Sequence, residues 1–374
     1  MRIAGIRVHQ AAEPFDVSFL SGQALRTKSE SVILRLDYDN GMFSYGESAP
    51  RAYVTGETLS SVHELIQDSF APLLLHREIA NLEDVKTTLK DLETGFLQPA
   101  EKPCLSALGA VDIALLDGLG KLGNRPVAFY LGGPLPNPCV AYSASVPFLP
   151  DERIRQLFQR FRHYPFTHLK VLVGDDLSWN VERLALLRSL FGDGVDLRIE
   201  VNGKWSFEQA LAHVKELERF RISAVEQPLP AHDIEGLRGF REQTGMRVIV
   251  DESLCTLSDA KRLIDSKACD VLNIKISKCG GLLRSKAIAD FALSAQVPSQ
   301  LGAHVGETEI LAAAGRHFAA TTPLLWIDGG YSFLLFGGRK AEKSGPKKEK
   351  PFGPGLGLPF LNQAQSFSIK GGPP

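Results

Sequence analysis

Acidic residues end three successive apolar runs in the middle of the chain. Glu200 closes the run DLRIE, Glu226 closes ISAVE, and Asp251 follows VIV. Carboxylates at the ends of neighbouring parallel strands meet at one mouth of a barrel, where their mutual repulsion requires a neutralising cation. Hard oxygen ligands that leave coordination positions open suit Mg²⁺. The three acids therefore predict a magnesium site that could also bind substrate oxygens.

Short β-rich runs that alternate with amphipathic segments must position these acids. They are CVAYSASV, THLKVLVG, DLRIEVN, ISAVEQPL, MRVIVDES, DVLNIKIS, VPSQLGAH and PLLWIDGG. Eight strands joined by helical crossovers are the pattern of a (β/α)8 barrel, whose active site forms where the strands end. The sequence thus predicts an α/β fold, a TIM-type (β/α)8 barrel with an N-terminal α+β capping domain.

The capping domain is predicted over residues 1–133. Its first part alternates like strands and turns at Asn40-Gly41, which is a hairpin signal. Apolar residues spaced three and four apart then predict helices over 58–69, 82–92 and 103–122. The Gly- and Pro-rich stretch LGGPLPNP is suited to a linker. We therefore expect the barrel over 134–335 and a C-terminal segment, 336–374, that returns to the first domain.

The composition favours a protein that acts on small molecules. Of 374 residues, 44% are hydrophobic and 23% charged, and the net charge is -1. This balance gives no attraction to nucleic acid or to an anionic membrane. The five cysteines are scattered and form no CxxC pair, so neither a disulfide framework nor a zinc site is expected. Because no secretory signal or membrane-spanning apolar run is evident, we expect a cytoplasmic location.

The ordered set of strand-end motifs resembles the enolase superfamily, in its mandelate racemase/muconate lactonizing enzyme family. The matching motifs are EVN with Glu200, VEQP with Glu226, VDES with Asp251 and NIKISKCGG with Lys275. Outside the barrel, YGESAPRAYVTGET is similar to the family's capping-domain loop, SALGAVDIALLDGLGKLGNRPVAFYLGG to its long helix, and GPGLGLP to its closing segment. Each motif alone is weak, but the set is specific and covers nearly the whole chain.

The resemblance implies a common half-reaction on a small-molecule carboxylate. Mg²⁺ binds the substrate carboxylate, a barrel base removes the proton α to it, and the metal stabilises the resulting enediolate. Carried over by position, Glu200, Glu226 and Asp251 are the metal ligands, although the family usually has Asp at the first. Lys275 is then either the base, if desolvation and nearby cations keep it neutral, or an ion-pair partner of the acids. Homo-oligomers are implied by the resemblance as well.

The run FTHLKVLVGDD, residues 166–176, departs from the family at its second base. The family's second strand carries Lys-x-Lys before a Gly, and the second Lys is the base opposite the strand-six lysine. Alignment on Gly174 puts Lys170 first and Leu172 second, so that base is missing. A shift of two residues, which keeps the same face inward, instead makes the motif His168-x-Lys170 and restores Lys170 as the base. We favour the alignment on Gly174, and the alternative stays open.

This choice separates two kinds of reaction. Racemases and epimerases of this kind use two bases, one on each face of the enediolate, whereas one base is enough for β-elimination or cycloisomerisation. We therefore favour a one-base lyase or cycloisomerase-like reaction at Lys275. The alternative is a two-base racemase or epimerase of amino-acid or dipeptide derivatives that uses Lys170 and Lys275. A third hypothesis is a non-catalytic protein that binds a metabolite.

Further polar residues around the barrel mouth are candidates for contacting the substrate. Strand ends supply some of them, and loops of the first domain, which cover the mouth in this family, supply the others. Arginines there could pair with a second carboxylate, whereas a strand-end histidine or aspartate can equally be a structural residue. The candidates are Asn202, Glu252, His304, Glu307 and Asp328 on the barrel, and Arg26, Arg51 and Tyr53 in the first domain.

Overall fold

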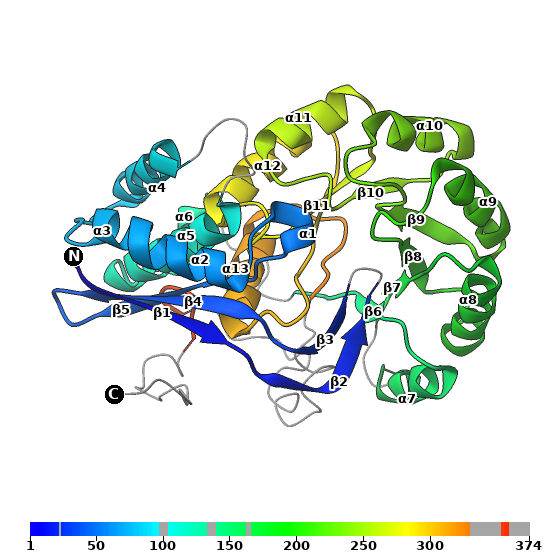
Figure 1. Ribbon diagram of the computed structural model, residues 1–374, viewed down its shortest axis with the longest axis horizontal. Helices are drawn as coiled ribbons and strands as arrows, with labels where there is room; N and C mark the ends of the chain where they lie inside the picture. Colours follow the sequence, from blue (N-terminus) through cyan, green and yellow to red (C-terminus); the bar gives the residue numbers. More distant parts are fainter. Residues whose placement is uncertain (22–23, 97–103, 133–139, 162–165, 330–352, 359–374) are drawn as a thin grey trace.

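The computed structural model describes residues 1–21, 24–96, 104–132, 140–161, 166–329 and 353–358. These residues form an α+β domain that packs against a larger α/β unit (Figure 1). The predicted boundary at 133 and most of the predicted C-terminal segment lie outside the described residues. In the described ranges, none of the helices combines the length and the apolarity that crossing a bilayer requires.

An antiparallel sheet in the order β1-β4-β5 is the centre of the first domain. β4 turns into β5 at Asn40-Gly41, where Gly41 has a φ of 80° that glycine adopts without strain. The predicted hairpin is therefore confirmed. A second, two-stranded sheet reaches the barrel, where the Leu20 oxygen accepts a hydrogen bond from Phe148 N (3.0 Å). The strands are β1 (Ile3–Ala11), β2 (Pro14–Leu20), β3 (Leu25–Lys28), β4 (Ser31–Tyr38) and β5 (Phe43–Ser48).

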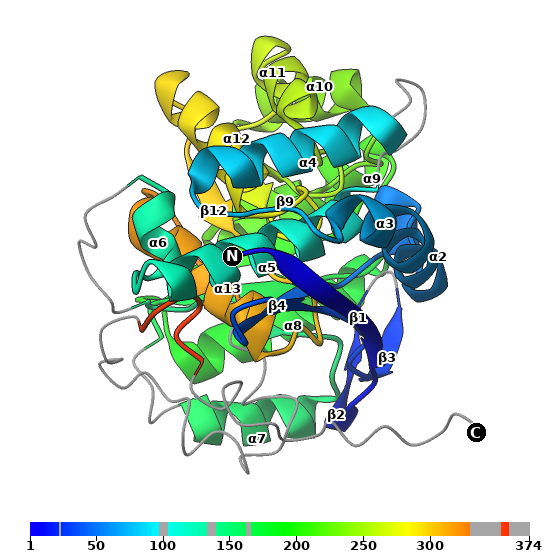
Figure 2. The same ribbon diagram turned by 90° about the vertical axis from the view of Figure 1, so that its left-hand side faces the viewer.

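Helices cover one side of this sheet. α5 (Leu105–Leu122) packs against β5 so closely that a methyl group on Gly46 would lie 1.8 Å from the Ala110 oxygen. α4 (Leu82–Phe96) lies beside α5 (Figure 2). The helix predicted over 58–69 is instead α2, a π-helical turn (Leu65–Phe70) and α3. The short helices are α1 (Ala52–Thr55), α2 (Leu59–Glu64), α3 (Ala71–Leu74) and α6 (Val127–Tyr130).

Seven parallel strands follow one another in chain order in the second unit. They are β6 (Ala144–Val146), β7 (His168–Leu172), β8 (Asp196–Glu200), β9 (Ile222–Glu226), β10 (Val248–Val250), β11 (Val271–Ile274) and β12 (Ser299–Leu301). Residues 325–328 complete the ring, because Leu301 N donates to the Trp326 oxygen (3.0 Å) and Ser143 N donates to the Ile327 oxygen (2.7 Å). The eighth predicted run thus lies between β12 and β6, and the predicted (β/α)8 barrel is confirmed.

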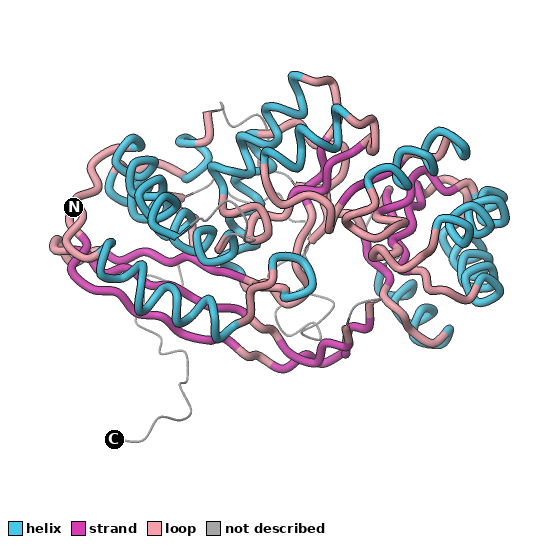
Figure 3. The backbone as a smooth tube through the Cα atoms, turned by 45° about the horizontal axis from the view of Figure 1, so that its top comes forward, coloured by secondary structure: helices cyan, strands magenta, loops and turns pink. Residues whose placement is uncertain are grey.

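Helices lie on the outer side of the barrel strands (Figure 3). Side chains of Asp176, Ser206 and Thr256 accept backbone N–H groups where α8, α9 and α11 begin, which satisfies donors that a helix leaves unpaired. The helices are α7 (Asp151–Phe161), α8 (Leu177–Phe191), α9 (Phe207–Leu217), α10 (Ile234–Thr244), α11 (Leu257–Asp265), α12 (Leu282–Ser294) and α13 (Glu309–Thr321), with a 3₁₀ turn at Glu218–Phe220.

Two buried acids of the first domain fix helices of the barrel. Asp112 in α5 accepts a hydrogen bond from Leu282 N (2.5 Å) where α12 begins. Glu47 in β5 accepts one from Thr308 N (2.8 Å) where α13 begins. A carboxylate at a helix N-terminus satisfies exposed N–H groups and complements the helix dipole. The first domain therefore fixes the segments that follow the sixth and seventh barrel strands.

Candidate functional site

The three predicted metal ligands meet at the mouth of the barrel. Glu200 and Glu226 end β8 and β9, and Asp251 follows β10. Each can place one carboxylate oxygen within 4.8 Å of the other two, and all three side chains are buried. Three oxygen donors at this separation suit one small divalent cation, with coordination positions left for substrate oxygens. The donor set therefore fits Mg²⁺.

Amide side chains orient two of these acids. Asn273 Nδ2 and Gln300 Nε2 donate to the two oxygens of Glu226, at 2.7 and 3.0 Å. Asn202 Nδ2 donates to Glu200 Oε1 at 2.7 Å. Burial raises the pKa of Glu226 to about 7. These donors fix each carboxylate in one orientation, as ligands of a metal site require.

Two lysines that follow β11, the sixth barrel strand, hold Asp251. Lys275 Nζ lies 2.5 Å from Asp251 Oδ2, and Lys278 Nζ lies 2.7 Å from Oδ1. Burial opposes the charge on Asp251, yet the two ammonium groups hold its pKa well below the usual range. Burial likewise opposes the charge on Lys275, but Asp251 and Glu200 raise its pKa above the usual value. In this arrangement Lys275 is an ammonium ion paired with a carboxylate.

Leu172 and Lys170 lie on β7, the strand next to β8, which ends in Glu200. In the pairing of β7 with β8, Leu172 lies beside Glu200 and Lys170 lies one inward position deeper. The alignment on Gly174 stays a prediction. The Lys170 side chain nevertheless reaches the acids, with Nζ 3.1 Å from Glu200 Oε2 and 3.4 Å from Glu226 Oε1. An ammonium group therefore lies on this flank of the acid cluster as well.

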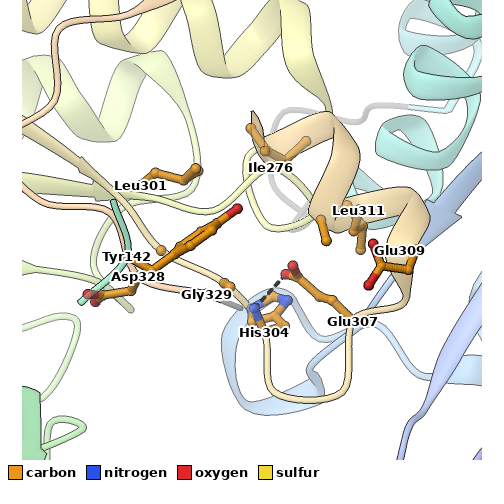
Figure 4. Close-up of a pocket in the computed structure, with 13 residues that line it drawn as sticks. Tyr142, Ile276, Leu301, His304, Glu307, Glu309, Leu311, Asp328 and Gly329 are labelled. Carbon is orange, nitrogen blue, oxygen red and sulfur yellow. Dashed lines mark hydrogen bonds between the residues drawn. The ribbon is translucent and has the colours of Figure 1, made fainter. Parts of the chain in front are cut away.

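Asp328 lies inside the barrel beneath the three acids. Its carboxylate pairs with Arg198 NH2 (2.8 Å) and Lys170 Nζ (2.9 Å), and it is 1% exposed. In Figure 4 this carboxylate points away from His304 and Glu307. Asp328 thus makes two internal ion pairs and also lines the cavity drawn in Figure 4, and its contact with substrate stays a prediction.

Basic side chains match the acids of this cluster in number. Among the described residues, the ion-paired acids are Glu200, Glu226, Asp251 and Asp328, and their basic partners are Lys170, Arg198, Lys275 and Lys278. The expectation that the acids need a metal for neutrality was therefore incomplete, because these ion pairs already offset their charge. A divalent cation would add positive charge that favours an anionic substrate.

A cavity lined by Glu200 and by residues of the first domain lies at the mouth of the barrel. Its walls include the predicted contacts Arg26, Arg51, Tyr53, Asn202, Glu252 and His304, together with Phe19, Leu172 and both site lysines. Arg51 is buried and donates to the Val305 oxygen (2.8 Å), while Arg26 pairs with Glu30 (2.7 Å). Burial lowers the pKa of Arg51 to about 10. Both domains thus contribute side chains to one cavity.

His304 lines both this cavity and the neighbouring one, which is drawn in Figure 4. It is 4% exposed, and neither ring nitrogen has a hydrogen-bond partner in the described part of the chain. Burial, then Arg51 and Lys275, lower its pKa well below the usual value, so the ring is neutral. Its backbone N–H donates to Glu307, whose pKa burial raises to about 8. A neutral imidazole with both nitrogens unused can hydrogen-bond a ligand.

Sequence reasoning missed the inner partners of the acids. They are Arg198, Asn273, Lys278 and Gln300. A signal did exist for Arg198, because it lies two residues before Glu200 and therefore shares its inward face. Charged residues in a strand usually lie on its solvent face, so an arginine is seldom expected to point into a barrel.

Two family patterns match the chain. The one described as "Enolase C-terminal domain-like" matches residues 152–362, and "Mandelate racemase / muconate lactonizing enzyme, N-terminal domain" matches residues 3–132. The L-Ala-D/L-Glu epimerase of Bacillus subtilis (strain 168) is 30% identical over 326 residues, which are 86% of each chain. The structure of its substrate-liganded complex has a TM-score of 0.81 at 27% identity and covers 90% of this chain and 92% of that one.

A second dipeptide epimerase and a cycloisomerase are also similar to the chain. The dipeptide epimerase of Methylococcus capsulatus, solved with Mg and the dipeptide L-Arg-D-Lys, has a TM-score of 0.80 at 26% identity and covers 90% of this chain and 92% of that one. The chloromuconate cycloisomerase of Cupriavidus necator is 29% identical over 273 residues, 72% of this chain and 70% of the relative. The chain belongs to the mandelate racemase/muconate lactonizing enzyme family of the enolase superfamily.

Proposed function

We propose that the protein is a Mg²⁺-dependent isomerase that inverts the carbon α to a carboxylate in a dipeptide or a related amino-acid derivative. The observation that carries this proposal is the placement of two lysines on β7 and just after β11, four barrel strands apart. Lys170 Nζ lies 3.1 Å from Glu200, and Lys275 Nζ lies 2.5 Å from Asp251. Relatives that are dipeptide epimerases support the same reaction and substrate class.

The acids would hold the metal, and the lysines would move the proton. Glu200, Glu226 and Asp251 are the proposed ligands of Mg²⁺, which when bound stabilises negative charge that develops on the substrate carboxylate. Lys275 Nζ, once deprotonated, accepts the proton as the Cα–H bond breaks on one face. Lys170 Nζ then donates a proton to the other face, so the configuration is inverted. In the reverse direction the two lysines exchange these roles.

The cavity walls would select and shield the substrate. Arg26 and Arg51 lie in the first-domain wall, where a guanidinium group can pair with a second carboxylate. His304 offers its unused ring nitrogens to a substrate amide or carboxylate. Tyr53 and Phe19 cover the same side and help to exclude water. These contacts favour a substrate with more than one polar group.

A one-base reaction is the second candidate, and Leu172 favours it. This side chain lies beside Glu200 at the level where the proposed metal ligands end their strands. If Lys170 stays in its ion pairs below, Lys275 acts alone. Such a site could still catalyse a cycloisomerisation, and a chloromuconate cycloisomerase is among the relatives.

Deuterium exchange separates the two candidates. The enzyme and Mg²⁺ would be incubated in D₂O with L-Ala-L-Glu, with its epimer L-Ala-D-Glu, and with a panel of N-acyl amino acids and muconates. An epimerase introduces deuterium at the α-carbon and interconverts the epimers. Turnover of a muconate without inversion of any dipeptide would instead support the one-base candidate. Mg²⁺ binding without turnover of any compound would support the third hypothesis, a non-catalytic protein that binds a metabolite.

A further inference from the structure

A charged layer lies beneath the proposed metal ligands, where barrels are usually filled by branched apolar side chains. Its centre is Arg198 on β8, which is fully buried. Arg198 NH1 donates to Gln300 Oε1 (2.6 Å), and NH2 donates to Ser143 Oγ (2.8 Å) and Asp328 Oδ1 (2.8 Å). Such a layer costs desolvation energy, so its side chains need close partners.

The Arg198 guanidinium is fixed from several sides of the barrel. Besides these hydrogen bonds, its carbon Cζ lies 4.5 Å from the ring centre of Trp326, in a cation–π contact. The partners come from β12, from residues 325–328 and from the residue before β6. Asp328 is therefore held by a group that has little freedom to move.

Asp328 in turn holds Lys170. Three carboxylates surround Lys170 Nζ: Glu200 (3.1 Å), Glu226 (3.4 Å) and Asp328 (2.9 Å). The first two are proposed metal ligands, so a bound cation would compete with the ammonium group for them. Asp328 lies outside that ligand set and keeps its contact with Lys170. Asp328 does not line the substrate cavity; it lines the neighbouring one, where its carboxylate points away from His304 and Glu307 (Figure 4).

We infer that Asp328, fixed by Arg198, is a positioning residue that holds Lys170 on its face of the substrate. The inference rests on the proposed two-base function and assigns to the strand-eight acid a role other than binding substrate. A general acid or base displaced by about 1 Å can lose about a hundredfold in rate. Loss of the Asp328 charge therefore harms proton transfer on the Lys170 face and spares the Lys275 face.

The test measures α-proton exchange of each epimer separately, by NMR in D₂O with Mg²⁺ and L-Ala-L-Glu or L-Ala-D-Glu as the probe. Lys170→Met identifies the epimer that exchanges on the Lys170 face. Asp328→Asn should lower exchange of that same epimer about 10- to 100-fold, through kcat more than KM, and leave the other epimer near the wild-type rate. Ser143→Ala is the matched control, because it removes one partner of Arg198 without touching Lys170. It should leave the exchange rates of both epimers near their wild-type values.

An equal fall in the α-proton exchange rates of both epimers in Asp328→Asn would overturn the inference and assign Asp328 a purely structural role. If that variant does not fold, Asp328→Glu keeps a charge for Arg198 and displaces the carboxylate, and it should show the same selectivity for one epimer. The proposed function fails separately, if wild-type enzyme exchanges neither epimer or if Lys170→Met slows both alike. Either result would remove the basis of the inference as well.

Discussion

Leu172 lies directly beside Glu200 in the parallel pairing of β7 with β8. An apolar side chain thus occupies the level at which the proposed metal ligands end their strands, while the nearest lysine on that strand is one inward position deeper. Lys170 overcomes this offset by extension, since its Nζ reaches within 3.1 Å of Glu200 Oε2. The two departures from the family that the sequence predicts, Leu172 in the second strand and Glu200 in the third, therefore lie side by side.

The first prediction concerns Leu172. We expect Leu172→Ala to destabilise the protein by about 2 kcal/mol, because a buried leucine that lines a cavity loses its contacts. Epimer interconversion should persist, since the proposed second proton donor is Lys170. Urea unfolding gives the stability, and chiral chromatography of a dipeptide gives the inversion. Loss of inversion in a folded variant would instead show that position 172 takes part in the chemistry.

The second prediction concerns the metal. Mg²⁺ should raise the melting temperature of the wild-type protein by mass action, and Glu226→Gln should abolish most of this increase because a carboxylate ligand is lost. Glu252→Gln is the matched control. Glu252 is a neighbouring acid whose pKa burial and Asp251 raise to about 8, and it is not one of the three acids whose oxygens lie within 4.8 Å of one another. Equal responses of both variants to Mg²⁺ would contradict the ligand assignment.

The third prediction concerns His304. A substrate hydrogen bond to a neutral, otherwise unpartnered imidazole should contribute about 1 to 1.5 kcal/mol, so His304→Ala should lower kcat/KM about tenfold. His317→Gln provides a control at a buried histidine whose Nδ1 accepts a hydrogen bond from Ala128 N (3.2 Å), away from the cavity. It should lower stability with KM unchanged. An unaltered kcat/KM in His304→Ala would exclude the contact.

The fourth prediction concerns the pH dependence of stability. Burial raises the pKa of Asp112 to about 7 in the folded protein, against an ordinary value of 3.8 in the unfolded chain. Between these two values the folded state binds one proton more than the unfolded state, so stability falls as pH rises, by at most about 1.4 kcal/mol per pH unit. Asp112→Asn lacks the titrating carboxyl and therefore this pH-dependent contribution to stability. Urea unfolding from pH 4 to pH 8 should therefore show the free energy of unfolding of the wild type falling relative to that of the variant as pH rises. A difference in unfolding free energy that stays constant with pH would contradict the raised pKa.

Much of the architecture follows from the sequence. Strand-end acids recur with the helical crossovers, so Glu200, Glu226 and Asp251 could be brought together from periodicity alone. The hairpin at Asn40-Gly41 was equally clear, because glycine supplies the positive φ that the turn requires. These features depend on local patterns that the chain repeats.

The inner contacts of the site could not be predicted in the same way. Lys170 and Leu172 share one face, and only the register with β8 and the length of a lysine side chain decide which atoms reach Glu200. Asp328 ends a segment that forms a single bridge with β12, so its inward direction depends on barrel closure. Contacts among side chains from different strands have no periodic signal in the sequence.

Paired lysine variants test the central claim most directly. Each epimer of a dipeptide substrate would be incubated with Mg²⁺ in D₂O, and α-deuterium would be followed for Lys170→Met and Lys275→Met. Two bases on opposite faces predict that each variant loses exchange with one epimer and keeps it with the other, the two variants in complementary fashion. Loss of all exchange in Lys275→Met together with unimpaired turnover in Lys170→Met would contradict the account and identify a one-base enzyme.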